Sequence, residues 1–173
     1  MSTSDTEPDA DAFVASLGGA GVAVSETTGA SFGADLAELV ETPAVGAELP
    51  FPDLSLSDAP ADVETAPSAD DVAAARTGVT AAEFGVAEYG SVAVRSRPGG
   101  DEPVSLYPER HVAVVRASDI VDLDGAFERL GELLPAGESV VFATGASATA
   151  DMGKFVQGVH GPGEVAVLLV GDR

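Results

Sequence analysis

Two short apolar runs near the C-terminus, both rich in β-branched residues, constrain the fold most. SVVFA occupies 139–143 and VAVLLV occupies 165–170. Runs of this length and composition are typical of strands buried on both faces of a parallel sheet. Small residues and a Gly/Pro-marked loop lie between them, with room for one or two helical turns. The pattern predicts an α/β unit that places a loop and a helix N-terminus at the carboxyl edge of the sheet.

Strand and helix patterns alternate through the second half of the chain. The stretch 111–115 predicts a strand. A helix is predicted from Asp122 or Asp124 to Leu134, because its apolar residues recur on one helical face. We therefore expect one α/β domain over 9–173, with a mostly parallel sheet flanked by helices, after an acidic tail at 1–8.

The first half of the chain has weaker patterns. We expect a short helix ending at Gly18–Gly19, a strand at 22–24, a helix at 33–41 and a helix at 69–76 capped by Ser68. Five prolines interrupt 42–68, which predicts an irregular surface segment with at most one short strand. The stretch 78–94 predicts a turn and then two strands joined at Tyr89–Gly90, and 97–102 predicts a polar loop.

The charge balance is extreme, with 29 acidic against 8 basic residues and a net charge of −21. Mutual repulsion at this density weakens the compact state at low salt, whereas molar salt screens it. Acid-rich, lysine-poor chains resemble those of salt-in extreme halophiles, so we expect a haloarchaeal source. The alternative is that the acids bind a cation or a basic partner, but they are dispersed without metal-ligand spacing. Because no basic patch exists, the sequence predicts no nucleic-acid binding.

Several other classes are disfavoured by composition. There is no cysteine, which excludes disulfides and cysteine-held clusters or zinc within this chain. No apolar run approaches the roughly 20 residues of a membrane-spanning helix. The first eight residues are polar and acidic, without the basic and apolar regions of a secretory signal. We expect a cytoplasmic protein.

The string TGASATAD at 144–151 is the first candidate site, because it follows a predicted strand and precedes the predicted helical turns. Its backbone amides, including that of Gly145, and the hydroxyls of Thr144, Ser147 and Thr149 could hold a carboxylate or phosphate. Asp151 fits such a site only if it is protonated or engages a hydroxyl of the ligand. The alternative is that Ser147 or Thr149 only caps the helix.

The string GVHGP at 158–162 is the second candidate. His160, beside Gly161, could act as a general acid or base, or could simply fix the turn through a hydrogen bond. Glu83 and Glu88 lie in a small-residue, apolar stretch, where a carboxylate could act as a base or nucleophile, although exposed strand acids are commoner.

The scarce basic residues allow two interpretations. Arg95, Arg97 and Arg110 either neutralise local acids or receive an anionic substrate, and their positions in the sequence do not distinguish these roles. His111 precedes a predicted strand and is interpreted as a strand-end residue.

Three strings in order resemble motifs of the LUD-domain family. GVTAAEFGVAEYGS at 78–91 resembles its "GvTgAd-x-x-IAeTGT" region, TGASATAD its "TGPSxTADI" motif, and GVHGP its "GvHGP" motif. The resemblance includes the group of small lactate-utilisation C proteins within this family. The main departure is Tyr89, which stands where the family pattern has a Thr.

The resemblance implies a NagB/RpiA/CoA-transferase-like fold, shared in outline with 5-formyltetrahydrofolate cyclo-ligase. It also implies a part in oxidising L-lactate to pyruvate, beside two partner subunits that carry iron–sulfur clusters. We expect no cofactor and no metal in this chain itself, which would then be a cluster-free accessory subunit.

A second hypothesis is a stand-alone enzyme of the wider superfamily, acting on or binding a small anionic metabolite, a CoA ester or a folate derivative. In that case the hydroxyls of 144–151, with Gly145, Asp151 and Gly161, would bind the anion. His160 or Glu88 would be the catalytic acid or base.

Overall fold

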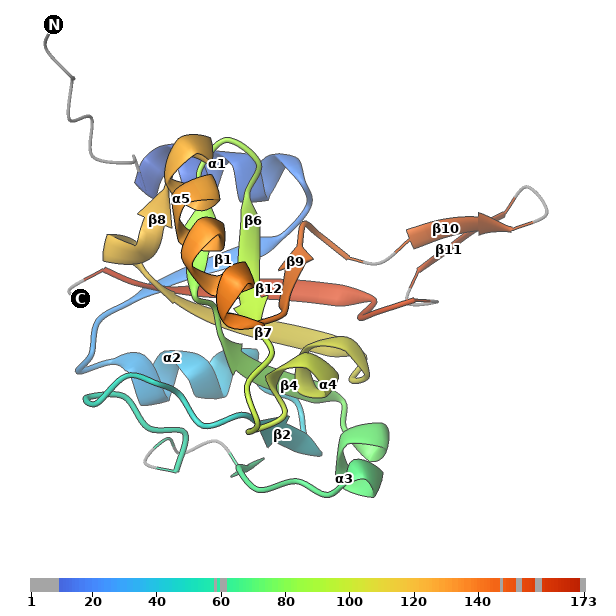
Figure 1. The fold of residues 1–173 in the computed structure, drawn as a ribbon. Coiled ribbons are helices and arrows are strands. Elements are labelled where there is room, and N and C mark those ends of the chain that lie inside the picture. The colour runs from blue at the N-terminus through green and yellow to red at the C-terminus, as the bar shows by residue number, and fades with distance from the viewer. Residues whose placement is uncertain are drawn as a thin grey trace, which may run out of the picture.

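A six-stranded parallel sheet forms the centre of the molecule, as the computed structural model of residues 10–57, 59, 62–146, 148–151, 154–157 and 160–171 describes it (Figure 1). Its strands run in the order β1 (Ala23–Thr27), β12 (Glu164–Val170), β7 (Arg110–Arg116), β4 (Thr77–Ala81), β2 (Ala44–Gly46) and β3 (Val63–Glu64). Every neighbouring pair is parallel. The predicted α/β class with a mostly parallel sheet is confirmed.

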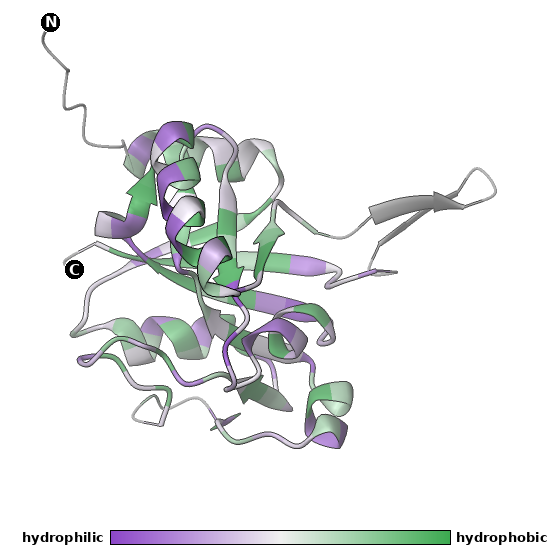
Figure 2. Ribbon diagram, in the orientation of Figure 1, coloured by the Kyte–Doolittle hydropathy of each residue, from purple (hydrophilic) through white to green (hydrophobic). Residues whose placement is uncertain are grey.

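The apolar runs of β12 and β7 lie side by side at the centre of this sheet. Their register pairs Val167 with Ala113 and Leu168 with Val114, and all four side chains are fully buried. Both faces of these strands are covered, which explains why the two sequences are apolar without alternation (Figure 2). The predictions of strands at 111–115 and 165–170 are confirmed.

One face of the main sheet packs against α2 (Phe32–Leu39) and the Pro-rich segment after β2. Phe32 and Leu36 supply the apolar stripe of the helix. The predicted segment 42–68 contains two short strands, β2 and β3, where at most one was expected, and its other described residues are irregular. It is also more than a surface loop. Its side chains Leu49, Phe51, Leu54 and Leu56 are buried in the same cluster. The prolines prevent regular structure, while the single apolar residues between them still enter the core.

The other face packs against α1 (Ala10–Gly19), whose Phe13 and Leu17 contact β7 and β12 side chains. A short helix α3 (Ala69–Ala74) begins at the predicted cap Ser68, which forms a reciprocal capping box with Asp71. A further helix, α4 (Asp101–Leu106), was not predicted. The loop expected at 97–102 overlaps the first turn of α4, which begins at Asp101.

A smaller sheet, in the order β8 (Ile120–Val121), β5 (Phe84–Val86), β6 (Ser91–Arg95) and β9 (Val140–Ala143), carries α5 (Leu123–Leu133). Asp122 caps α5 by accepting from Gly125 N. One 3₁₀ turn, Ala117–Asp119, precedes β8, and another, Leu134–Ala136, lies between α5 and β9. The predicted hairpin turn at Tyr89–Gly90 is confirmed, since β5 and β6 pair antiparallel around it.

Two strand predictions were wrong in their placement. β9 was expected inside the parallel sheet, but it pairs antiparallel with β6, and its Phe142 is 45% exposed. The expected turn at the start of 78–94 is instead the central strand β4. Gly78 allows this because α4 crosses closely there, so that a Cβ at this position would lie 1.9 Å from Val104 O.

The helix predicted after Ala143 is also absent from the described part of that stretch. Strands β10 (Ala148–Asp151) and β11 (Lys154–Gln157) form an antiparallel hairpin there, which projects from the body of the molecule (Figure 1). The loop at 160–163 leads into the first residue of β12. It therefore lies at the amino edge of the main sheet. The loop predicted at the carboxyl edge of that sheet, after 139–143, instead follows β9 of the smaller sheet.

Candidate functional site

The strings GVTAAEFGVAEYGS (78–91) and TGASATAD (144–151) meet at a pair of hydroxyl groups. Ser91 Oγ and Thr144 Oγ1 lie 2.5 Å apart in a hydrogen bond. The register of the small sheet brings them together, because β6 and β9 pair Val92 with Ala143 and each hydroxyl belongs to the next residue outward. Thr144 of the predicted anion site is thus engaged with the Tyr89–Gly90 turn.

Two glycines let α1 pack against this junction. Gly90 has φ +60°, and a Cβ there would lie 2.5 Å from Leu17 N of α1. Gly145 has φ +83°, and a Cβ there would lie 3.0 Å from Ala20 O, just beyond the helix. The left-handed backbone and the close approach both favour glycine at these positions. Gly145 therefore has a packing role in the structure.

The described part of the GVHGP string (158–162) borders a cavity at the amino edge of the main sheet. The cavity has a volume of ≈ 400 Å³. Its lining includes two glycines of the 160–163 loop together with residues that precede or begin β2, β4, β7 and β12: Glu41, Arg76, Tyr107, Pro108, Glu109, Arg110, Gly161, Gly163 and Glu164. Of the predicted site residues, Gly161 is the one that this cavity includes.

An ion-pair network crosses the cavity. Arg76 lies 3.0 Å from Glu41 and 3.6 Å from Glu109. Arg110 lies 3.1 Å from Glu41 and 2.5 Å from Glu164. Two guanidinium groups therefore share three carboxylates, and the 76%-exposed Glu109 has the longest of the four contacts. An anionic ligand would reach Arg76 most readily by displacing Glu109.

Arg95 and Arg97 each form an ion pair with a nearby acid. Arg95 contacts Glu138 at 2.9 Å, and this pair raises the pKa of Arg95 and lowers that of Glu138. Arg97 lies 3.1 Å from the buried Asp101, whose pKa is raised by its burial in spite of the nearby guanidinium. Like Arg110, both side chains neutralise local acids. The buried Asp101 was not predicted, since it lies in a stretch expected to be a loop.

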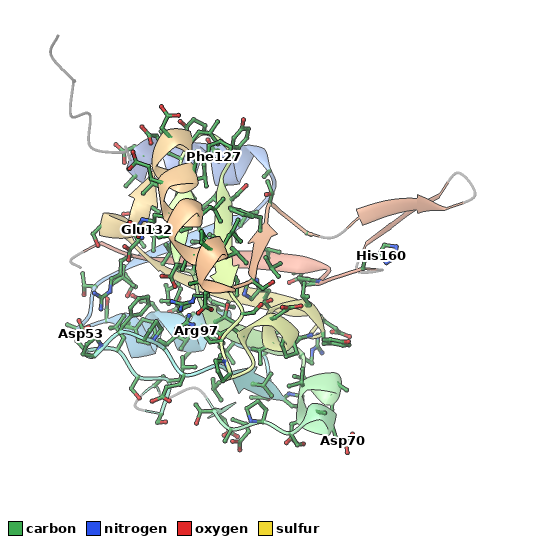
Figure 3. All side chains as sticks on the ribbon, in the orientation of Figure 1. Asp53, Asp70, Arg97, Phe127, Glu132 and His160 are labelled. Carbon is green, nitrogen blue, oxygen red and sulfur yellow. The ribbon has the colours of Figure 1, made fainter. Side chains whose placement is uncertain are left out.

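Glu88, predicted as a catalytic group, contacts a helix end. Its Oε1 accepts from Leu123 N, the first residue of α5, at 3.2 Å. A carboxylate at this place satisfies a free helix N–H and complements the helix dipole. His160, the other predicted catalytic group, is exposed and lies where the chain returns from β11 to the body (Figure 3).

Two of the remaining predicted anion-binding residues fall on the hairpin. Thr149 and Asp151 belong to β10, and Ser147 lies outside the described residues. Because 148–151 is a strand, no helix N-terminus is available there to present backbone amides to an anion. The residues predicted as one site are therefore divided between the hydroxyl junction, the hairpin and the cavity edge.

A buried polar pair was missed by sequence reasoning. His111, interpreted as a strand-end residue, is 1% exposed, and its Nε2 lies 2.9 Å from Thr80 Oγ1 on the adjacent strand. Burial lowers the pKa of His111 to about 4, so its imidazole is neutral near pH 7. Nδ1 has no hydrogen-bond partner among the described residues. The available signal in the sequence was a polar residue at the start of an otherwise apolar run.

Neither a metal-ligand group nor a membrane-spanning helix occurs in the part of the chain that the structure describes. No group of three or more His, Asp or Glu side chains there is arranged to hold a metal ion. No described helix is long and apolar enough to cross a membrane.

Comparison with known proteins supports one family. The chain is 35% identical over 105 residues to lactate utilization protein C of Bacillus subtilis, covering 57% of this chain and 44% of that protein. It is 34% identical over 124 residues to lactate utilization protein C 1 of Bacillus mycoides, covering 68% of this chain and 50% of that protein. The matched regions thus span about half the length of these curated relatives.

A crystal structure of a DUF162 family protein from Deinococcus radiodurans has the same fold. The TM-score is 0.70 at 21% sequence identity, over 93% of this chain and 95% of that one. The family model of the LUD domain matches residues 12–170, which is most of the chain. The chain therefore belongs to the LUD-domain family.

Proposed function

We propose that this protein is a cluster-free accessory subunit of an iron–sulfur system that oxidises L-lactate to pyruvate. The proposal rests first on family membership and on relatives named lactate utilization protein C. Those relatives are matched over about half of their length, so their role is extended to this chain as a proposal.

The observation that carries the subunit role is the placement of the motifs around the hairpin. Thr144–Gly145 and His160–Gly161 stand at its two ends, and β10–β11 projects from the body between them (Figure 1). A two-stranded hairpin is only marginally stable alone, and its open edges can pair with another chain. We infer that this hairpin contacts the cluster-bearing subunits.

Co-purification tests the proposal. The full chain, affinity-tagged and expressed in its lactate-grown host, is isolated in molar KCl. We expect cysteine-rich iron–sulfur proteins and lactate-dependent dye reduction in the eluate. A variant in which a Gly-Gly link replaces 148–157 should lose both while remaining folded. Asp70→Asn on α3 is the matched control and should retain both (Figure 3). Recovery of the tagged protein alone, without partners, would contradict the proposal.

The cavity supports a second candidate function, a stand-alone protein that binds a small anionic metabolite, CoA ester or folate derivative. Its ≈ 400 Å³ volume lies within the range of small-molecule sites, and Arg76 and Arg110 reach it. Thermal-shift titration with L-lactate, pyruvate, acetyl-CoA and 5-formyltetrahydrofolate tests this. The candidate requires saturable stabilisation that Arg76→Gln removes. Failure of all four ligands would eliminate it and would leave the subunit proposal intact.

A further inference from the structure

Large apolar side chains gather on the surface around α5. Among the described residues, six large hydrophobic side chains are at least 36% exposed, and five of them lie on α5, next to it or on the sheet beneath: Tyr89, Leu123, Phe127, Leu134 and Phe142. Phe127 is 64% exposed, and Figure 3 places it on α5, away from His160 and the hairpin. A chain with net charge −21 that keeps such a patch exposed is expected to use it for binding.

The patch encloses a groove, here named the α5 groove. Its walls and floor are Val86, Tyr89, Ser91, Leu123, Ala126, Phe127, Leu130 and Phe142, and its volume is ≈ 210 Å³. Small-molecule sites usually occupy about 300–1,000 Å³ and offer several polar groups. The α5 groove is smaller, and Ser91 and Tyr89 supply the only polar side-chain atoms of its lining. A groove of this kind fits one or two anchoring side chains of a protein segment.

Tyr89 forms one wall of the groove. This residue stands where the LUD-domain motif has a small threonine, and it is 57% exposed in the turn between β5 and β6. The ring extends the apolar surface from α5 across the turn. Tyr89 therefore closes one side of the groove, which a threonine at this position would leave open.

The rim of the α5 groove is acidic. Glu88 lies at its end, where it accepts from Leu123 N at 3.2 Å. Asp124 and Glu128 are exposed on α5 beside Phe127. The one basic residue of the helix, Arg129, is directed elsewhere and lies 3.2 Å from Asp119. A second copy would bring the same acids against this rim, whereas a basic segment would complement it.

We propose that the α5 groove docks an amphipathic helix of a partner protein, with one aromatic or leucine anchor in the groove and lysine or arginine residues against the rim. Amphipathic helices bind apolar grooves through anchors spaced at one face, with flanking charges that select the partner. The α5 groove shares no lining residue with the cavity at the amino edge, and its Phe127 lies away from the hairpin (Figure 3). The inference therefore does not depend on the lactate-utilization role.

A designed probe tests the inference directly. The probe is a fluorescein-labelled helical peptide of about five turns, with Leu and Phe on one face and Lys and Arg on the other. A scrambled peptide of the same composition is its control. Binding to the full chain is followed by fluorescence anisotropy at the lowest KCl concentration that keeps the protein folded, because higher salt screens the charges of the rim. We expect saturable binding at least about tenfold tighter for the patterned peptide.

Two variants locate the binding. Phe127→Ser should weaken it about thirtyfold, as loss of a central anchor does. Leu134→Ser removes a comparably exposed apolar side chain outside the groove and should leave the affinity unchanged. Since Phe127 is largely exposed, its variant should keep the wild-type circular dichroism spectrum and melting temperature. Glu128→Lys should weaken the basic peptide without removing an apolar contact.

Four outcomes would overturn the inference. The patterned peptide fails to bind, the scrambled peptide binds equally well, or Phe127→Ser binds like the wild type. In the fourth, sedimentation shows a wild-type dimer that Phe127→Ser converts to a monomer, which would mean that a second copy occupies the groove.

Discussion

His111 Nε2 and Thr80 Oγ1 lie 2.9 Å apart in the core, where they join strands β7 and β4 of the main sheet. The imidazole is buried and its pKa is lowered to about 4. Protonation therefore opposes folding. Between pH 6.5 and about 4 the unfolded chain binds a proton at this residue and the folded chain does not, so the free energy of unfolding falls as the pH falls.

The first prediction concerns this pH dependence. The His111 contribution is fully present above about pH 6.5, and its loss reaches about 3 kcal/mol near pH 4. His111→Gln removes the titration, so its stability should fall less steeply than that of the wild type between about pH 6.5 and 4.5. Urea unfolding at constant KCl measures both slopes, and carboxylates common to the two proteins cancel in the difference. Equal slopes would show that His111 does not titrate as described.

The second prediction concerns the Ser91–Thr144 hydrogen bond, which joins the first two motifs. Thr144→Val and Ser91→Ala should each lower the free energy of unfolding by about 1 kcal/mol, because each leaves the other hydroxyl without its hydrogen-bond partner. The double variant should cost less than the sum, with a coupling of about 1 kcal/mol. Additive costs in a double-mutant cycle would mean that the two hydroxyls act independently.

The third prediction compares two glycines. Gly90→Ala places a Cβ 2.5 Å from Leu17 N at a φ of +60°, and it should lower stability by at least about 2 kcal/mol. Gly131 lies within α5, and a Cβ there would meet no atom within 4 Å, so Gly131→Ala should raise stability by about 0.5–1 kcal/mol. Thermal unfolding of both variants gives the comparison, and equal effects would contradict the packing of α1 on the turn.

The fourth prediction concerns salt. A net charge of −21 on 173 residues should make the melting temperature rise with KCl concentration, because ions screen the mutual repulsion of the acids. NaCl at equal concentration is the control and should act alike if screening is the cause. A melting temperature that is independent of salt would remove the argument for an origin in a high-salt organism.

The main sheet was largely predictable because its central strands are apolar on both faces. β7 and β12 followed from their valine- and leucine-rich runs, and α3 and α5 from the caps Ser68 and Asp122. β4 was missed because Gly78 and the small residues around it are typical of a turn. Its strand conformation depends on α4 packing closely against Gly78, which is a tertiary contact.

The site was less predictable than the fold. The apolar run of β9 indicates a strand but not which sheet the strand joins. Thr144 was therefore predicted at the edge of the parallel sheet, whereas it follows a strand of the smaller sheet. The small residues at 148–151 fit a capped helix as well as a strand, and the hairpin partner in 154–157 decided between them. Glu88 looked like a candidate base, whereas its contact with α5 depends on how a distant helix packs.

Growth on L-lactate tests the central claim most directly. The gene is deleted in its own host, and growth is measured on L-lactate and on pyruvate as sole carbon source. The account predicts a defect on L-lactate that the wild-type gene restores, and normal growth on pyruvate. Normal growth of the deletion strain on both carbon sources, with unchanged lactate-oxidising activity in its extracts, would contradict the proposed role.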